Sequence, residues 1–356
     1  MNNNTIKEIL ELIKNSQYIA ITGHIRPDGD CYGSVLGFYN YIRDNKKSFK
    51  KVKECDLFLT SNEVADEFYN ASLLKQANMF TVRNYDLLIC FDASATDRIE
   101  NYSLLEGHSE VVLNIDHHRT NTYYGDYNYV RELSSVCEVL FDFFEEEKIS
   151  LVVAKCLYYG ILTDTGGFRF SMTTRRTMEL AGLCMEIGHL DTEGIINRAF
   201  NVKTPEFNKL LGMALINTEY YALPTIPDCP VNNNAIAYVF IDKDMLKSLG
   251  YLKPEYARIE NIPAILKSTL DCIVSVTVVE LSDNKFRISL RCHKKLDVAA
   301  IAEEFNGGGH TAAAGLDLKV DKKKPKQRQL AEFIDFIGKR ILEQIEEKNL
   351  TWADFV

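Results

Sequence analysis

Four short clusters of Asp and His residues in this chain have the composition of a site that holds divalent metal ions. The clusters are HIRPDGD (24–30), FDAS (91–94), NIDHH (114–118) and LTDTGGF (162–168). Their candidate metal ligands are His24, Asp28, Asp30, Asp92, His117 and Asp164. Imidazole and carboxylate donors in this proportion favour Mn²⁺ or Mg²⁺ over metals that prefer thiolates. Four carboxylates also nearly neutralise two divalent cations, so the set could accept a phosphate and a hydroxide. This indicates metal-assisted hydrolysis of a phosphate ester.

Taken one at a time, the clusters also have ordinary structural explanations. The turn at 24–30 could simply cap the next helix with an Asp side chain. Single residues such as Asp92 and Asp164 are more often structural than functional. The adjacent His117 and His118 are more specific, because two neighbouring histidines at the end of a strand have few packing explanations. The four clusters together make a metal site the better interpretation.

Apolar runs that predict strands end at three of the four clusters. These runs are 18–22, 85–91 and 111–115. Near-continuous apolar runs are typical of parallel strands covered on both faces, and ligands collect beyond the carboxyl ends of such strands. Other segments predict a strand at 56–59 and helices at 33–44, 134–147 and 151–162. We therefore expect the clusters to meet at one edge of a mostly parallel sheet.

The second half of the chain predicts a further domain. Helical patterns continue to about residue 221, and the segment 222–234 holds three Pro and three Asn without periodicity, which favours a linker. Strands are then expected at 235–241, 272–281 and 286–291, and helices at 296–305 and 328–347. We predict an α/β protein with a first domain at 1–190, a helical connector and linker at 191–234, and a second domain at 235–356.

Composition excludes several classes of protein. Nine Cys occur without any C-x-x-C pair, which indicates reduced thiols rather than a disulfide framework. The net charge of −9 disfavours binding to long nucleic acid, which normally needs a basic face. We find neither the pattern of a signal peptide nor an apolar stretch near the roughly 20 residues that span a bilayer. These observations predict a cytoplasmic protein without a membrane partner.

The motifs resemble those of the DHH phosphoesterase family, which is named for the Asp-His-His found here at 116–118. The resemblance extends to the second domain, where GGGH (307–310) and the segment 313–315 look like the signature of the associated DHHA1 domain. Within the family, the chain is most similar to the nanoRNase/pAp phosphatase group and the stand-alone cyclic-di-AMP and pApA phosphodiesterases. This resemblance implies a mostly parallel-sheet DHH domain and a smaller α/β DHHA1 domain joined by a helical connector.

The resemblance also implies roles for the clustered residues. One Mn²⁺ would be held by His24, Asp28 and Asp92, and a second by Asp30, Asp92, His117 and Asp164. Asp92, His117 and His118 would be catalytic, with His118 also touching the substrate phosphate. Asp116 would fix the His pair through hydrogen bonds. Cys31 follows Asp30 where the family more often has Ala or Ser, and because Cys is also small we expect little effect.

The Gly-rich segment of the second domain has the chemistry of a phosphate site. Consecutive glycines let backbone N–H groups approach an anion, and Arg291 and His310 would add charged donors. The substrate-binding set is therefore His118, Arg291, Gly307, Gly308, Gly309 and His310. The structural alternative is a Gly-rich turn between two helices. The Lys-rich segment 319–329 is better interpreted as a solvated loop.

The implied activity is hydrolysis of short nucleotide phosphoesters by a metal-activated hydroxide. Expected substrates are short oligoribonucleotides, pApA, cyclic-di-AMP and pAp, and a homodimer is compatible with the resemblance. Two alternatives stay open. One is an enzyme like the inorganic pyrophosphatases and exopolyphosphatases, against which the GGGH motif argues. The other is a non-catalytic nucleotide- or RNA-binding module, which the complete ligand set disfavours.

Overall fold

The chain forms two compact units, each with its own sheet and core. The computed structural model describes residues 3–60, 74–75, 77–201, 204–230, 233–251 and 261–355. The first unit spans 1–202 and the second spans 203–356. The division falls inside the segment 191–234, which the sequence predicts as a connector.

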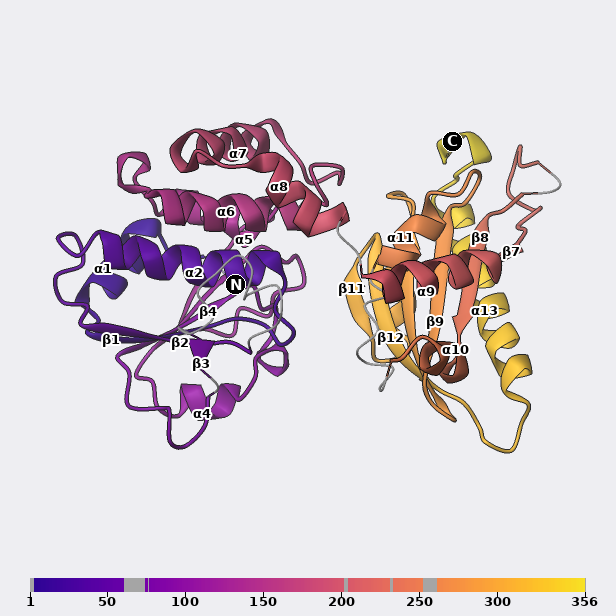
Figure 1. Ribbon diagram of the computed structural model, residues 1–356, viewed down its shortest axis with the longest axis horizontal. Helices are drawn as coiled ribbons and strands as arrows, with labels where there is room; N and C mark the ends of the chain where they lie inside the picture. Colours follow the sequence, from indigo (N-terminus) through magenta and orange to yellow (C-terminus); the bar gives the residue numbers. More distant parts are fainter. Residues whose placement is uncertain are drawn as a thin grey trace. The chain divides into compact units, whose positions relative to one another are not determined.

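The first unit is built on a six-stranded parallel sheet of order β3-β2-β1-β4-β5-β6 (Figure 1). Its strands are β1 (Tyr18–Thr22), β2 (Glu54–Phe58), β3 (Leu74–Lys75), β4 (Leu87–Phe91), β5 (Val112–Asp116) and β6 (Tyr127–Val130). Every residue of β4 and β5 is buried, as expected for strands covered on both faces. The predicted parallel sheet is confirmed.

Helices cover both faces of this sheet. They are α1 (Ile6–Asn15), α2 (Gly29–Asp44), α4 (Tyr102–Glu106), α5 (Val136–Val139), α6 (Leu151–Asp164), α7 (Arg175–Gly188) and α8 (Thr192–Ile196). Short helical turns add η2 (Thr96–Arg98), η3 (Leu140–Asp142), η4 (Glu146–Lys148) and the π-helical η5 (Asn197–Asn201). Helices α2 and α6 lie on one face, α7 stacks beyond α6, and α4 lies on the other face (Figure 1).

Two helices differ from the sequence prediction. Helix α2 begins at Gly29 instead of residue 33, because the Asp28 carboxylate caps it by accepting the backbone N–H groups of Asp30 and Cys31. The single helix predicted at 134–147 is wrong. That segment forms α5, η3 and η4 instead, and it buries Leu140 of η3 and the following Phe143 in the core.

The second unit has a mixed six-stranded sheet of order β11-β12-β10-β9-β8-β7, antiparallel except for the β8–β9 pair. Its strands are β7 (Glu219–Tyr221), β8 (Ile236–Ile241), β9 (Val274–Ser282), β10 (Lys285–Cys292), β11 (Gly308–His310) and β12 (Ala313–Lys319). Its helices are α9 (Pro205–Ile216), α10 (Lys243–Ser248), α11 (Asn261–Lys267), α12 (Val298–Glu303) and α13 (Lys326–Glu347), followed by the short turn η7 (Trp352–Asp354).

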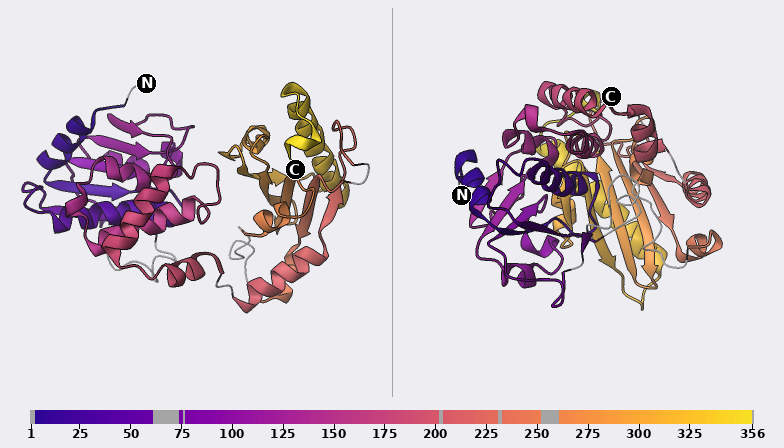
Figure 2. Two further views of the ribbon diagram at one scale, coloured as in Figure 1. Left: turned by 90° about the horizontal axis from the view of Figure 1, so that it is seen from above. Right: turned by 60° about the vertical axis from the view of Figure 1, so that its left-hand side comes forward.

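The two faces of the second sheet pack against different helices. Helices α9 and α13 lie on opposite faces (Figure 1 and Figure 2). Helices α12 and α13 pack against the face of β10 that carries Phe286, Ile288 and Leu290. The residues that alternate with these three on β10 point to the other face and are only half-buried. The same core includes Leu223 and Ile226, which lie in the segment 222–234. Among the described residues, no helix is both long and apolar enough to cross a membrane.

Candidate metal centre

The carboxyl ends of three neighbouring strands carry most of the clustered donors. His24 lies just beyond β1, Asp92 follows β4 directly, and His117 follows the last residue of β5. These strands are adjacent and parallel in the order β1-β4-β5. Parallel strands end at the same sheet edge, so residues far apart in sequence are brought together. This agrees with the placement expected from the apolar runs.

The start of α2 adds two carboxylates with different environments. Asp28 precedes the helix, and its side chain is 57% exposed. Asp30 lies in the first helical turn and is almost completely buried. The Asp30 carboxylate accepts the backbone N–H groups of Val136, at 2.6 Å, and Cys137, at 2.9 Å. Because those amides begin α5, the short helix end fixes the orientation of Asp30.

Asp92 lies at the centre of the cluster. Its Oδ2 is 3.4 Å from His24 Nε2, and its Oδ1 is 3.5 Å from His117 Nε2. Two donors that bind one ion at about 2.1 Å each lie about 3–3.5 Å apart, so these separations suit shared metal ligands. Asp92 also has a left-handed backbone, with φ of 56°. Each oxygen of this carboxylate therefore faces a different histidine, which is the geometry of a bridging ligand.

Backbone carbonyls set which ring nitrogen of each histidine faces the cluster. His24 Nδ1 donates to the Ile25 carbonyl at 2.8 Å, and His117 Nδ1 donates to the Leu133 carbonyl at 3.1 Å. Partners of this kind fix the tautomer and the ring orientation of metal-binding histidines. Both Nε2 atoms therefore point toward the carboxylates, and in a neutral ring each would offer its lone pair to a cation. The sequence gives no sign of these carbonyls, since any residue type supplies one.

His118 is held differently from its neighbour. Its Nδ1 lies 2.8 Å from Asp116 Oδ1, and the other oxygen of Asp116 accepts a hydrogen bond from Asn121 Nδ2 at 2.6 Å. The expected hydrogen bond from Asp116 to the His pair is thus made to His118. Sequence reasoning did not identify Asn121, although an amide side chain three residues after a His pair is a searchable pattern.

The donor atoms fall into three overlapping groups whose members lie within 4.8 Å of one another. The groups are His24–Cys31–Asp92, Asp92–His117–His118 and Asp30–His117–Asp164. Asp92 and His117 each belong to two groups, which makes them the shared residues of the centre. Asp28 lies in none of these groups, although its Oδ1 is 3.6 Å from His24 Nε2.

The protonation of the cluster reflects crowded negative charge. Burial, with the nearby Asp92 carboxylate, raises the pKa of Asp30 to about 7. Burial also raises the pKa of Asp164 well above its usual value. Burial opposes ionisation of Asp92 as well, but the imidazoles of His117 and His24 hold its pKa below the ordinary range. One carboxylate is charged while its neighbours resist losing their protons, because the site has several acids and little positive charge.

The residues present fit a divalent cation. Asp92 Oδ1 is buried and no hydrogen bond reaches it. A buried carboxylate oxygen without a partner is costly, and a bound cation removes that cost. The ion pairs that reach Asp92 in the described part of the chain come from histidines. Neutral imidazoles and carboxylates are suitable ligands for Mn²⁺.

The Gly-rich segment of the second unit is a strand rather than a turn between helices. Residues Gly308–His310 form β11, which pairs with β12. A Cβ on Gly307 would meet the Gly315 carbonyl oxygen at 2.4 Å, and Gly309 has φ of 148°, so both positions require glycine. Within the described part of the chain, no atom lies within 4 Å of a Cβ built on Gly308, so there is space beside this backbone for a ligand.

Arg291 and His310 are aligned across this sheet. Both pair with Ala313 of β12, Arg291 from β10 and His310 from β11. Residues paired across adjacent strands project their side chains to the same face. Arg291 also donates to the Leu290 carbonyl at 2.9 Å. The two basic residues therefore flank a short Ala side chain on one face, an arrangement that could hold an anion.

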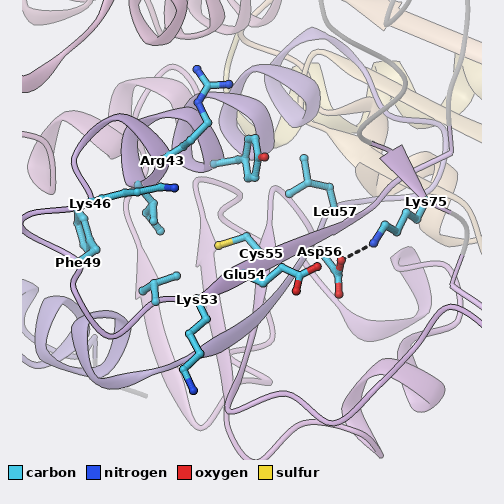
Figure 3. A pocket seen from close by; sticks show the side chains of 12 residues that line it. Arg43, Lys46, Phe49, Lys53, Glu54, Cys55, Asp56, Leu57 and Lys75 are labelled. Atoms are coloured by element: carbon cyan, nitrogen blue, oxygen red, sulfur yellow. Dashed lines mark hydrogen bonds and ion pairs between the residues drawn. The ribbon is translucent and has the colours of Figure 1, made fainter.

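A separate cavity of about 300 Å³ in the first unit is lined by residues of α2, β2 and β3 (Figure 3). None of the clustered donors lines it. Its buried acid, Asp56, is paired with Lys75 at 2.5 Å and with Arg83 at 2.9 Å. These contacts neutralise Asp56, so this cavity offers no comparable set of metal donors.

Comparison with known families agrees with both units. Residues 18–161 match the DHH family, N-terminal domain, and residues 248–343 match the DHHA1 domain. The chain therefore belongs to the DHH/DHHA1 phosphoesterase family and is a phosphoesterase. The family resemblance inferred from the motifs is confirmed.

Individual relatives align over most of the chain. It is 28% identical to the bifunctional oligoribonuclease and PAP phosphatase NrnA of Mycoplasma genitalium, covering 88% of this chain and 93% of that protein. It is 27% identical to the NrnA of Bacillus subtilis, covering 87% and 92%. An exopolyphosphatase-related protein from Bacteroides fragilis has the same fold, with a TM-score of 0.81 and 21% identity over 95% of this chain and 97% of that one.

Proposed function

We propose that this protein is a two-metal, Mn²⁺-dependent phosphoesterase that hydrolyses short nucleotide phosphoesters. The main support for this proposal is the position of Asp92 between two histidines. One of its carboxylate oxygens faces His24 and the other faces His117. The relatives named as oligoribonucleases and PAP phosphatases support the substrate class. Short oligoribonucleotides, pAp, pApA and cyclic-di-AMP are the proposed substrates.

The proposed ligand sets are those that the family resemblance implies, and all their members except Asp28 also occur in the three donor groups. His24, Asp28 and Asp92 would hold one ion, and Asp30, Asp92, His117 and Asp164 would hold the other. When bound, two such ions lower the pKa of a water molecule and stabilise the charge that develops on a phosphoryl group. The carbonyls of Ile25 and Leu133 keep the two Nε2 atoms aimed at the site, so the ligands need little rearrangement.

His118 is proposed to act on the substrate instead of a metal. Asp116 holds its Nδ1, and the side chain is 25% exposed. Burial opposes protonation, but the Asp116 carboxylate and nearby Asp92 raise the pKa of His118 overall. A protonated Nε2 can donate to a phosphate oxygen, and this charge-assisted bond strengthens as negative charge grows on that oxygen.

The second unit is proposed to bind a part of the substrate that does not react. The open backbone of Gly308, together with Gly307, Gly309, His310 and Arg291, has the donors that a phosphate needs. Binding energy gained at such a remote group can be used to position the reacting phosphate. A cytoplasmic location and a homodimer stay predictions from the sequence.

A substrate panel tests the proposal. Purified protein in Mn²⁺ would be given pAp, pApA, cyclic-di-AMP, two- to five-residue RNAs, pyrophosphate and tripolyphosphate, with products resolved by chromatography. We expect hydrolysis of one or more nucleotides and little release from pyrophosphate or tripolyphosphate. Preference for the inorganic substrates would replace this function with a pyrophosphatase-like one. Nucleotide binding without hydrolysis would favour the non-catalytic alternative.

A further inference from the structure

Cys31 places a thiol against one half of the metal centre. The residue lies in the first turn of α2, and its side chain is completely buried. Its Sγ, a ring nitrogen of His24 and a carboxylate oxygen of Asp92 lie within 4.8 Å of one another. A Cβ on Gly23 would be only 2.3 Å from this sulfur, so the glycine provides the space that the thiol occupies. Packing thus fixes the sulfur beside two proposed ligands.

A second observation concerns Asp92, the carboxylate that this half shares with the other. Its side chain is buried, and within the described residues its Oδ1, which faces His117 and His118, accepts no hydrogen bond, while its Oδ2 lies 3.4 Å from His24 Nε2. His24 Nδ1 donates to the Ile25 carbonyl, so a neutral His24 ring directs the lone pair of Nε2 toward Asp92. A nitrogen, a carboxylate oxygen and a sulfur are therefore directed at one small volume. Sulfur combined with nitrogen and oxygen donors is a ligand set typical of Zn²⁺ and similar ions.

We propose that Cys31 is an additional ligand for thiophilic divalent ions at the His24–Asp92 half of the centre and that it sets the metal selectivity of this protein. Such ions include Cd²⁺, Co²⁺ and Zn²⁺. This inference rests on the proposed metal function of His24 and Asp92.

Binding of a metal ion by Cys31 requires that the thiol lose its proton. A metal–sulfur bond forms as the Cys31 S–H bond breaks, and the proton passes to water. A hard ion such as Mn²⁺ gains little from sulfur and would use the oxygen and nitrogen donors. A softer ion would recruit the thiolate and bind more tightly.

Cys90 provides a matched control. It is also completely buried, and it lies on β4 two residues before Asp92. Within the described residues, however, it belongs to none of the metal-capable donor groups. Cys31→Ala and Cys90→Ala therefore remove equally buried thiols near the same carboxylate, and only the first should change metal binding.

The test is a metal titration of the full chain. Chelator-stripped protein, kept reduced, would be titrated with Co²⁺ and Cd²⁺ while the ultraviolet absorption of thiolate–metal bonds is recorded. We expect wild-type protein and Cys90→Ala to show this absorption, saturating at one thiolate per chain, and Cys31→Ala to lack it. The wild-type spectrum reports whether any thiolate binds the metal, and the comparison with the two variants assigns that thiolate to Cys31 or excludes it.

Affinities then separate a ligand from a packing residue. In Cys31→Ala the affinity for Cd²⁺ should fall by about tenfold or more, the scale on which groups around a metal change its binding, while the affinity for Mn²⁺ should change little. Cys31→Ser, closest in size to the native residue, repeats the measurement if the Ala variant is unstable by circular dichroism. Absence of the absorption, its survival in Cys31→Ala, or equal losses for both metals would overturn the inference. If one of these results occurs while wild-type protein binds Mn²⁺ normally, the role of Cys31 is wrong and the proposed function stands. If wild-type protein does not bind Mn²⁺ at all, the proposed function itself is wrong.

Discussion

At the scale of single residues, the sequence indicates six candidate ligands, which stay a prediction, but it does not reveal the contacts that support them. His24, Asp92 and His117 can be recognised as possible metal ligands from their residue types alone. Their orientation depends on the carbonyls of Ile25 and Leu133, which are backbone groups brought close by folding. Cys31 was expected to have little effect, because its size is visible in the sequence and the direction of its sulfur is not.

Asp92 is the residue on which the proposed centre depends most. We expect Asp92→Ala to lower the rate of hydrolysis by at least about a thousandfold, because a bridging carboxylate serves both ions. The measurement is kcat on the best nucleotide substrate together with the metal content of the purified variant. Asp97→Ala is the control, since Asp97 is an exposed carboxylate five residues further along the chain. Full metal content with substantial activity in Asp92→Ala would contradict the two-metal assignment.

At the scale of elements, local patterns predicted the strands better than the helix ends. The apolar runs at 85–91 and 111–115 correspond to β4 and β5, because burial on both faces leaves a continuous signature. The segment 134–147 is apolar and helical in composition, yet it breaks into short turns. The glycines at 307–309 form β11 through pairing with β12, and sequence patterns do not reveal which strand will pair with which.

Helices α2 and α6 pack closely enough to depend on glycine. A Cβ on Gly33 of α2 would lie 2.6 Å from the Cys156 carbonyl oxygen of α6 and 2.8 Å from Cys137 Sγ. We expect Gly33→Ala to lower the free energy of unfolding by about 1–3 kcal/mol, as overpacking of a core does. Denaturant titration would measure this change, and metal affinity should fall as well, since Asp30 lies one turn before Gly33 on α2.

Gly182 of α7 is the matched control for that substitution. It is also a helical glycine, but no atom lies within 4 Å of a Cβ built on it. Gly182→Ala should therefore raise the free energy of unfolding by about 0.5–1 kcal/mol, because alanine loses less conformational entropy in a helix. Equal stabilities of the two variants would mean that the α2–α6 contact tolerates a methyl group.

At the scale of the whole molecule, metal binding should stabilise the fold and switch on activity. The cluster contains several buried acids whose mutual repulsion a cation relieves, so Mn²⁺ should raise the melting temperature of chelator-treated protein. Ca²⁺ should not restore hydrolysis, because it prefers larger, all-oxygen coordination. Thermal unfolding and activity would be measured with each metal, with Asp92→Ala as a control that should respond weakly. Freshly purified protein that is fully active with only zinc bound would contradict the Mn²⁺ prediction.

The sequence also predicts that the second unit binds a part of the substrate away from the metal centre. Arg291 and His310 belong to the second unit and are remote in sequence from every proposed metal ligand, yet they align through Ala313 on one sheet face. If they bind a non-reacting phosphate, each charge-assisted hydrogen bond is worth roughly 1.5–3 kcal/mol, or about ten- to a hundredfold in affinity. We expect Arg291→Ala and His310→Ala to raise KM for short nucleotides by that factor.

An artificial ester separates this role from a structural one. Bis-p-nitrophenyl phosphate has no second phosphate to hold, so both variants should hydrolyse it almost as well as wild type does. Some loss of kcat on the natural substrate is allowed, because remote binding energy can help to position the reacting group. Arg287→Ala is the control, since Arg287 lies on the same strand but is paired with Asp317 at 3.7 Å. Equal losses on both substrates would mean that Arg291 and His310 support folding or the metal centre, and the proposed role of the second unit would have to be abandoned.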